Sequence, residues 1–274
     1  MVFETIKSKY ILKVIFGYLL QKKYLGIIKY NKQIQKRVNL KVSDYKSYSD
    51  IEIEIIPVKN EGGKFININK EERIYYHIFF NDNEGEVKGT SLWKKNKKIK
   101  KIKKIKIIID YQVKSLKGLF NDCKCIESIY FNKSNRNNIN NTKNMFSGCS
   151  SLKEINFSNL NTNNVNDMGY MFFNCSSIKE INLANFNTNK VEFMNYMFYG
   201  CSSLEKVNIS SFNTQNVKYM NGMFLGCSSL KELNIANFNL NNVVDMDRMF
   251  LHCQEELKMK IRDQVKNIYY RALD

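Results

Sequence analysis

The sequence predicts an α/β fold in which a solenoid of 26-residue units follows a small helical segment and a small β-sheet domain. The main observation is a strict period. Six cysteines stand 26 residues apart, and a phenylalanine precedes each of them by three positions. They are Cys123, Cys149, Cys175, Cys201, Cys227 and Cys253. A period of this length indicates one supersecondary unit per repeat, stacked on its neighbours. The 43% of apolar residues allow a sizeable core and exclude global disorder.

Each unit contains one short predicted strand. Leu152, Ile155 and Phe157 have the L-x-x-L-x-L spacing of a leucine-rich repeat, and the pattern returns at 178–183, 204–209 and 230–235. We therefore expect a leucine-rich-repeat solenoid over residues 113–261, with six strands that line its concave face.

Each unit also contains a predicted short helix on the convex side. Val165, Met168 and Met171 recur at spacings of three residues, which indicates one apolar face of a helix. Thr162 stands where an N-cap is expected. A helix over 262–274, with Val265, Ile268, Tyr269 and Leu273 on one face, is predicted to cap the C-terminal end.

A small β-rich domain is predicted over residues 46–112. Isoleucines alternate with glutamates over 51–55, and further strands are expected at 66–68, 75–80 and 106–110. A helix at 112–120 is expected to cap the first unit of the solenoid.

Residues 1–45 are predicted to be helical. Ile-Leu-x-x-Ile-Phe-x-Tyr-Leu at 11–19 and Tyr-Leu-x-x-Ile-x-x-Asn-Lys at 24–32 resemble a degenerate F-box over residues 7–40. This resemblance implies recruitment of a ubiquitin ligase through its adaptor. The alternative is a helical hairpin that packs on the next domain.

The repeat itself resembles a known family. The string Asn-Phe-Asn-Thr-x-x-Val-x-x-Met-x-x-Met-Phe-x-x-Cys-Ser-Ser-Leu-x-x-x-Asn, as at 185–208, resembles the BspA-like leucine-rich repeats and extends over 119–261. The resemblance implies protein–protein or adhesive binding without a common catalytic activity, and it supplies no ligand residues.

The net charge of +17 is concentrated outside the repeats. Residues 1–118 hold 27 Lys and Arg against 12 Asp and Glu, whereas residues 119–253 hold 11 against 10. The segment Lys94–Lys106 contains nine lysines and could contact nucleic acid or an anionic membrane, or carry a nuclear-localisation signal. The favoured interpretation is a solvated loop.

The candidate partner-binding site is the outward face of the predicted strands, because the concave sheet is the usual binding surface of solenoids. Two columns of polar side chains cross it. The first contains Tyr130, Asn156, Asn182, Asn208, Asn234 and Lys260. The candidate residues of the second column are Glu154, Glu180, Lys206, Glu232 and Lys258. The alternative for the asparagines is a structural ladder in which their amides hydrogen-bond to each other.

No catalytic, cofactor-binding or metal-binding residues are predicted. The periodic cysteines are expected to be reduced and buried, with Cys125 as the most exposed thiol, and His77 is expected to be structural. No stretch reaches the roughly 20 apolar residues of a membrane span, and no signal-peptide cleavage site is evident. We expect an intracellular, cytoplasmic monomer.

The function expected from these observations is that of a non-enzymatic scaffold that binds a protein partner on the concave face. An F-box-type substrate receptor and a surface adhesin are the alternatives.

Overall fold

A computed structural model describes residues 50–274 except 82, 84, 93–101, 135, 266, 267 and 269, together with Lys36. The chain divides into two compact units, Met1–Asp50 and Ile51–Asp274. The F-box-like segment at 7–40 therefore lies outside the described residues, apart from Lys36. Everything that follows concerns the second unit.

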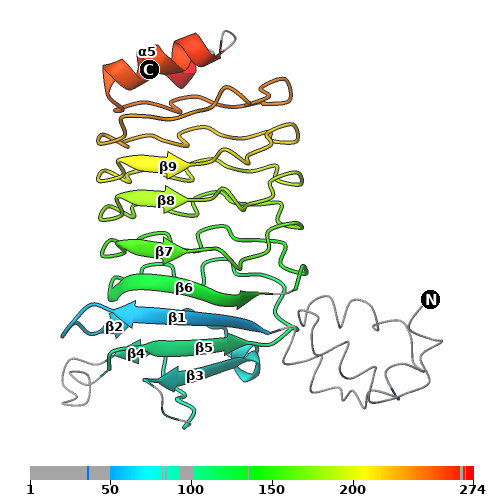
Figure 1. Cartoon of the computed structure of the whole chain (residues 1–274), viewed down its shortest axis with the longest axis vertical. Coiled ribbons are helices and arrows are strands. Elements are labelled where there is room, and N and C mark those ends of the chain that lie inside the picture. The colour runs from blue at the N-terminus through cyan, green and yellow to red at the C-terminus, as the bar shows by residue number, and fades with distance from the viewer. Residues whose placement is uncertain are drawn as a thin grey trace, which may run out of the picture. The chain divides into compact units, whose positions relative to one another are not determined.

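A five-stranded sheet forms one end of this unit (Figure 1). It contains β1 (Ile51–Pro57), β3 (Tyr76–Phe80), β5 (Ile105–Ile109), β6 (Ile126–Ser134) and β7 (Glu154–Asn156), in the order β3-β5-β1-β6-β7. β1 pairs antiparallel with both β5 and β6. Ile51, Ile53 and Ile55 are buried and the two glutamates between them are partly exposed, which confirms the alternation predicted over 51–55.

The strand predicted at 66–68 is absent. β2 (Gly63–Lys64) precedes it and pairs with β4 (Ser91–Leu92), and η2 (Arg73–Tyr75) follows it. The Asn67 amide N–H bonds to Leu119 O, and its side-chain Nδ2 bonds to Gly118 O and Asn121 O. The segment is thus attached to the turns at 118–121 rather than to a neighbouring strand.

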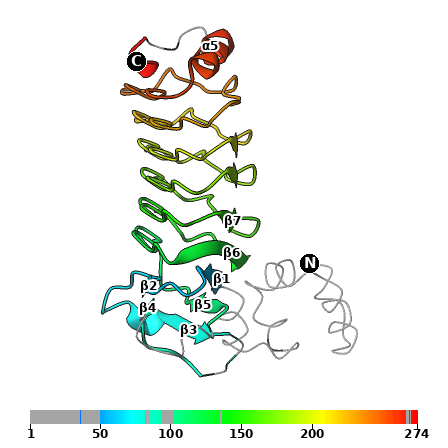
Figure 2. The same cartoon turned by 90° about the vertical axis from the view of Figure 1, so that its left-hand side faces the viewer.

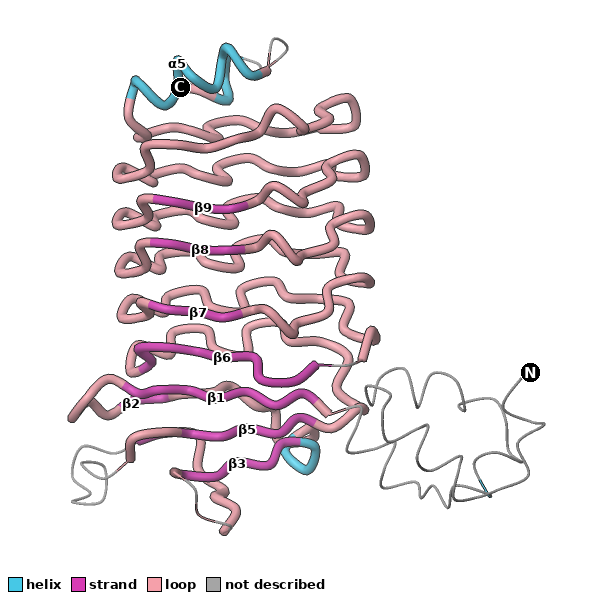
Figure 3. The backbone as a smooth tube through the Cα atoms, in the orientation of Figure 1, coloured by secondary structure: helices cyan, strands magenta, loops and turns pink. Residues whose placement is uncertain are grey.

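From residue 114 onward the chain forms stacked 26-residue coils, the first of which contains β6 (Figures 1 and 3). We number them coil 1 to coil 6 after the cysteines from Cys123 to Cys253. Each coil has a turn side, which precedes its cysteine (166–174 in coil 3), and a strand side, which follows it (178–183 in coil 3). Figure 2 shows the two sides apart, with β6 and β7 along one edge of the stack.

The turn sides are joined by the same set of backbone hydrogen bonds at every junction. Between coils 3 and 4, Met168 N, Tyr170 N, Phe172 N and Asn174 N donate to coil 4, and Glu192 N donates back to Asn166 O. Equivalent bonds join the other neighbouring coils from coil 1 to coil 6. Isolated parallel bridges run through this side at Asn141, Asp167, Phe193, Tyr219 and Asp245.

The predicted convex helices are wrong, because turns occupy these residues. Two residues per coil adopt the left-handed conformation, which interrupts an α-helix; in coil 3 they are Tyr170 (φ 59°) and Asn174 (φ 56°). Thr162 caps no helix. Its hydroxyl donates to Asn187 O and accepts from Asn187 N in the next coil, at 3.1 and 2.8 Å.

The α/β class and the leucine-rich-repeat solenoid are therefore wrong as predicted. The described residues of 50–274 form several small sheets and a single α-helix, α5 (Glu255–Gln264). β8 (Glu180–Asn182) and β9 (Lys206–Asn208) make a two-stranded parallel sheet separate from β7. Three-residue strands interrupted by turns replace the expected alternation of strand and helix.

Both predicted end caps also differ. Residues 112–120 form turns rather than a helix, and the antiparallel strand β1 covers the edge of coil 1 through β6. At the other end, α5 begins seven residues before the helix expected at 262–274 and includes residues 259–261, where the sixth strand was expected. Glu255 and Glu256 lie in the first turn of α5, where negative charge stabilises a helix.

The last residues of the chain make two further hydrogen bonds of the turn-side kind with coil 6. Arg248 N donates to Arg271 O, and Phe250 N donates to Ala272 O, so η4 (Tyr270–Ala272) lies along coil 6. Leu273 is buried as predicted, Val265 and Ile268 are partly buried, and Tyr269 lies outside the described residues.

A column of stacked phenylalanines fills the centre of the coils. Phe172, Phe198 and Phe224 lie 5.5 and 5.2 Å apart between ring centroids, with nearly parallel planes, and are fully buried. Each adds aromatic stacking to the apolar surface that it removes from water. The core therefore runs through the stack beside the turn side.

Candidate functional site

Most of the predicted partner-binding residues lie on the strand side. Tyr130 is on β6, Glu154 and Asn156 are on β7, Glu180 and Asn182 are on β8, and Lys206 and Asn208 are on β9. Glu232 continues the column through a parallel bridge to Lys206. Asn234 follows two residues later in coil 5.

The two lysines expected at the end of these columns do not lie there. Lys258 and Lys260 are on α5, where their ammonium groups pair with Glu255 and Glu256 at 2.8 and 2.9 Å. Lys258 is buried. Because the sixth strand is replaced by a helix, the candidate surface ends at coil 5.

The strand side is interrupted between β7 and β8. β6 pairs with β7, and β8 pairs with β9, but within the described residues no strand pairing joins β7 to β8. Lys153 N donates to Glu127 O and Glu205 N donates to Lys179 O, each at 2.8 Å. The equivalent bond from Lys179 N to Lys153 O is missing from this junction.

Like outward charges face each other across this junction. Lys153 of coil 2 has Lys179 as its counterpart in coil 3, and Glu154 has Glu180. Both pairs carry like charges, which destabilise neighbouring strands. Each lysine instead pairs away from the junction, Lys153 with Glu127 at 2.8 Å and Lys179 with Glu205 at 3.4 Å.

A groove of about 480 Å³ lies at this junction. Its walls include Glu154 and Asn156 from β7 and Asn182 from β8. Ile155 lines it and is partly exposed, whereas its counterparts Ile181 and Val207 are buried. The candidate surface thus offers a recess with an apolar floor and two like-charged carboxylates beside it.

The asparagines of the column make hydrogen bonds within their own coils. The side-chain oxygens of Asn156, Asn182, Asn208 and Asn234 each accept from the backbone N–H two residues later, at 2.8–3.2 Å. Each is an Asx turn that ends its strand. Each oxygen therefore already accepts one hydrogen bond within its own coil.

Tyr130 begins the column next to Glu154. Partial burial raises the pKa of Tyr130, and its hydrogen bond to the Glu154 carboxylate acts in the same direction. This pair anchors the Glu154 side chain at the groove.

All seven cysteines are free and buried. From Cys149 onward each thiol donates to the carbonyl of a phenylalanine in the preceding coil, as Cys201 does to Phe172 O at 3.1 Å. Burial raises the pKa of Cys201 to about 12. The prediction that Cys125 is exposed is wrong, because its thiol is buried against Gly63 and donates to Lys64 O at 3.2 Å.

His77 lies between two carboxylates in the terminal sheet. Its Nδ1 is 3.3 Å from Glu86 and its Nε2 is 3.3 Å from Asp110. Of the basic segment, Lys94–Lys101 lies outside the described residues. Lys104 and Lys106 pair with Glu54 and Glu52 of β1 at 3.5 and 3.0 Å, so this end of the segment is part of the sheet.

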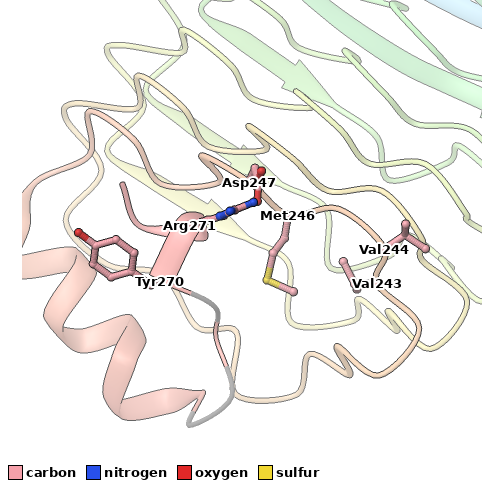
Figure 4. Close-up of a pocket in the computed structure, with 6 residues that line it drawn as sticks. All are labelled: Val243, Val244, Met246, Asp247, Tyr270 and Arg271. Atoms are coloured by element: carbon pink, nitrogen blue, oxygen red, sulfur yellow. The ribbon is translucent and has the colours of Figure 1, made fainter.

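A second recess, of about 460 Å³, lies at the C-terminal end of the stack (Figure 4). Val243, Val244 and Met246 of coil 6 line it together with Tyr270 and Arg271. Arg271 points toward Asp247 in Figure 4. We interpret this recess as the end of coil 6 that the short η4 segment leaves uncovered.

Two other kinds of site are absent from the described residues. No helix among them has the length and apolar composition needed to cross a bilayer. Within the same residues, no three His, Cys, Asp or Glu side chains are grouped so that they could hold a metal ion.

Comparison with known proteins identifies a family without an assigned activity. Residues 114–207 and 179–268 match the model of a family described as Mycoplasma protein of unknown function, DUF285. No curated protein and no solved structure matches the chain. The two matches together span residues 114–268, which is more than half of the sequence, and the chain therefore belongs to the DUF285 family.

Proposed function

We propose that this protein is a non-enzymatic binding module whose strand side engages another protein. The observation that carries the proposal is the interruption between β7 and β8. There a groove of about 480 Å³ leaves Ile155 partly exposed, and Glu154 and Glu180 place two negative charges at the junction.

The composition of this surface favours a protein ligand. Specific protein interfaces combine an apolar centre with a polar rim, and here the groove that Ile155 lines is also lined by the Glu154 carboxylate and by asparagine amides. The two glutamates favour a partner that brings a positive charge to the junction, because complementary charge raises the association rate.

The backbone adds a second means of recognition. Lys179 N and Lys153 O lack the bond that their counterparts make at the neighbouring junctions. An unmade main-chain hydrogen bond at a strand edge is a ready contact for a partner's backbone or side chain.

The test compares two charge reversals in an affinity purification from the source cells, quantified by mass spectrometry. Glu180→Lys changes the sign of the charge beside the groove without altering the buried Ile181. The matched control is Asp263→Lys on the exposed side of α5. Both substitutions add the same charge.

We expect proteins that the wild type retains to be lost or reduced at least about tenfold with Glu180→Lys, and to be kept with Asp263→Lys. Equal retention by all three proteins would show that the strand side is not the binding surface. Residues 1–45 used as a separate bait would test the F-box-type alternative through capture of a ligase adaptor.

A further inference from the structure

The groove between β7 and β8 can admit a side chain but not an additional strand. On the turn side, Asn144 N and Phe146 N of coil 2 donate to coil 3 at 3.0 and 2.9 Å. Within the groove lining, Asn185 Nδ2 donates to Phe157 O at 2.7 Å. A strand inserted between two neighbours would move them about 4.8 Å further apart, which these bonds between coils 2 and 3 exclude.

The groove combines apolar and hydrogen-bonding groups. Ile155 lines it and is partly exposed. The Glu154 carboxylate and the Asn182 amide belong to the same lining, and Glu180 lies two residues before Asn182 on β8. The Tyr130 hydroxyl donates a hydrogen bond to the Glu154 carboxylate. These walls suit a long side chain that has an apolar stem and a polar end.

The same column shows how the chain itself places a cation between two glutamates. Lys206 of β9 is in register with Glu180 on one side and with Glu232 on the other. Opposite charges on neighbouring strands stabilise their pairing. Glu154 and Glu180 are direct counterparts in coils 2 and 3, so no residue of the column lies between them.

The lysines next to these two glutamates pair in other directions. Lys153 of coil 2 pairs with Glu127 of coil 1 at 2.8 Å, and Lys179 of coil 3 pairs with Glu205 of coil 4 at 3.4 Å. Both ion pairs point away from the junction. A cation brought by a partner would therefore have at this junction the position that Lys206 has between Glu180 and Glu232.

We propose that the groove between β7 and β8 binds an arginine side chain of the protein partner, an inference that rests on the proposed function. The guanidinium lies between Glu154 and Glu180, and its methylene stem covers Ile155. A guanidinium presents several N–H donors in one plane, so a single group can donate to the carboxylates of both coils. It is also more weakly hydrated than an ammonium, so a partly apolar groove favours arginine over lysine.

Selection of displayed random peptides of about 12 residues on the immobilised full chain tests the proposal. The wild type is compared with Glu180→Lys and with the matched charge control Asp263→Lys. We expect arginine to be enriched at one position of the peptides that the wild type and Asp263→Lys retain, but not with Glu180→Lys. The net charge of +17 makes this outcome specific, because general attraction would enrich acidic peptides.

Calorimetric titration of one selected peptide then measures the contribution of the charge. The peptide carries arginine, lysine or citrulline at the enriched position, and citrulline keeps the length of arginine without its charge. We expect the dissociation constant to rise at least about tenfold with citrulline and by less with lysine. With Glu180→Gln, which keeps the size of the side chain, the difference between arginine and citrulline should decrease.

Three results of the selection overturn the proposal: no retained peptides, retained peptides without enriched arginine, or equal enrichment with Glu180→Lys. A dissociation constant that citrulline leaves unchanged also overturns it. The proposed function is tested separately by the affinity purification. Loss of cellular proteins with Glu180→Lys, together with a selection that shows no arginine, would keep the strand side as the binding surface and reject only the arginine.

Discussion

The two sides of the coils differ in continuity, although both repeat every 26 residues. The turn side carries the same backbone hydrogen bonds at every junction from coil 1 to coil 6. The strand side is paired between coils 1 and 2 and between coils 3 and 4, and is interrupted between coils 2 and 3. One side therefore holds the stack together, and the other can vary.

The two sides differ in the residues that determine whether neighbouring coils pair. Inward positions beside the turn side are uncharged and nearly identical in every coil, as with Phe172, Phe198 and Phe224. Outward positions of the strand side change sign from coil to coil, and Glu154 and Glu180 bring like charges together. Since cohesion comes from one side, the other is available for binding.

The largest expected effect is the loss of stability at high pH, which depends on the buried thiols beside the turn side. Burial raises the pKa of Cys201 and Cys253 to about 12 and of Cys125 to about 11, above the ordinary value of about 9. The folded state therefore favours the neutral thiols. The associated stability is complete below pH 9 and decreases as the pH rises from 9 toward 12, by about 1.4 kcal/mol per thiol and pH unit.

Urea unfolding between pH 8 and 10.5 measures this loss. Lysines and tyrosines also titrate in this range, so the comparison is with Cys201→Ala. Above pH 9, that variant should lose about 1.4 kcal/mol less per pH unit than the wild type, and below pH 9 the two should have the same slope. An identical slope for the two proteins would show that Cys201 does not titrate on unfolding.

The next largest effect compares the cores of the two sides. Phe198→Ala removes the ring between Phe172 and Phe224 and should lower the free energy of unfolding by about 3–5 kcal/mol. Ile155→Ala on the interrupted strand side should cost less than half as much, because Ile155 is already partly exposed. Denaturant titration of both variants measures the two losses of unfolding free energy. Equal losses would contradict the claim that the two sides contribute differently to stability.

The smallest expected effect comes from a substitution that replaces the like charges at the interruption by opposite charges. Glu154→Lys makes the column alternate in sign through Glu180, Lys206 and Glu232. An opposite-charge pair across strands is worth about 0.2–1 kcal/mol, so stability should rise by a few tenths of a kcal/mol despite the lost bond to Tyr130. Chemical denaturation detects this gain, and the reverse sign would show that like charge does not cause the interruption.

The sequence allowed the inward residues to be predicted, but not the backbone conformation of the segments that connect them. Alternation identified β1, and the period identified the buried phenylalanines and cysteines. The three-residue apolar spacing at Val165, Met168 and Met171 was interpreted as a helix, but it also fits turns that bury every third residue. The signals against a helix were Asp167, whose carboxylate accepts from Gly169 N, and Asn174.

Much of the candidate surface could be predicted, because outward positions on a strand alternate with inward ones. The error was at its end, where Glu256 in place of leucine marked a helix rather than a modified strand. The interruption could have been found by comparing charges one period apart.

Hydrogen exchange followed by NMR tests most directly the claim that the turn side holds the stack while the strand side is interrupted. Three amides occupy the same position in successive coils: Lys153, Lys179 and Glu205. We predict that Lys153, Glu205 and the turn-side Phe172 exchange slowly, and that Lys179 exchanges at least about 100-fold faster. Protection of Lys179 equal to that of Lys153 and Glu205 would contradict the account.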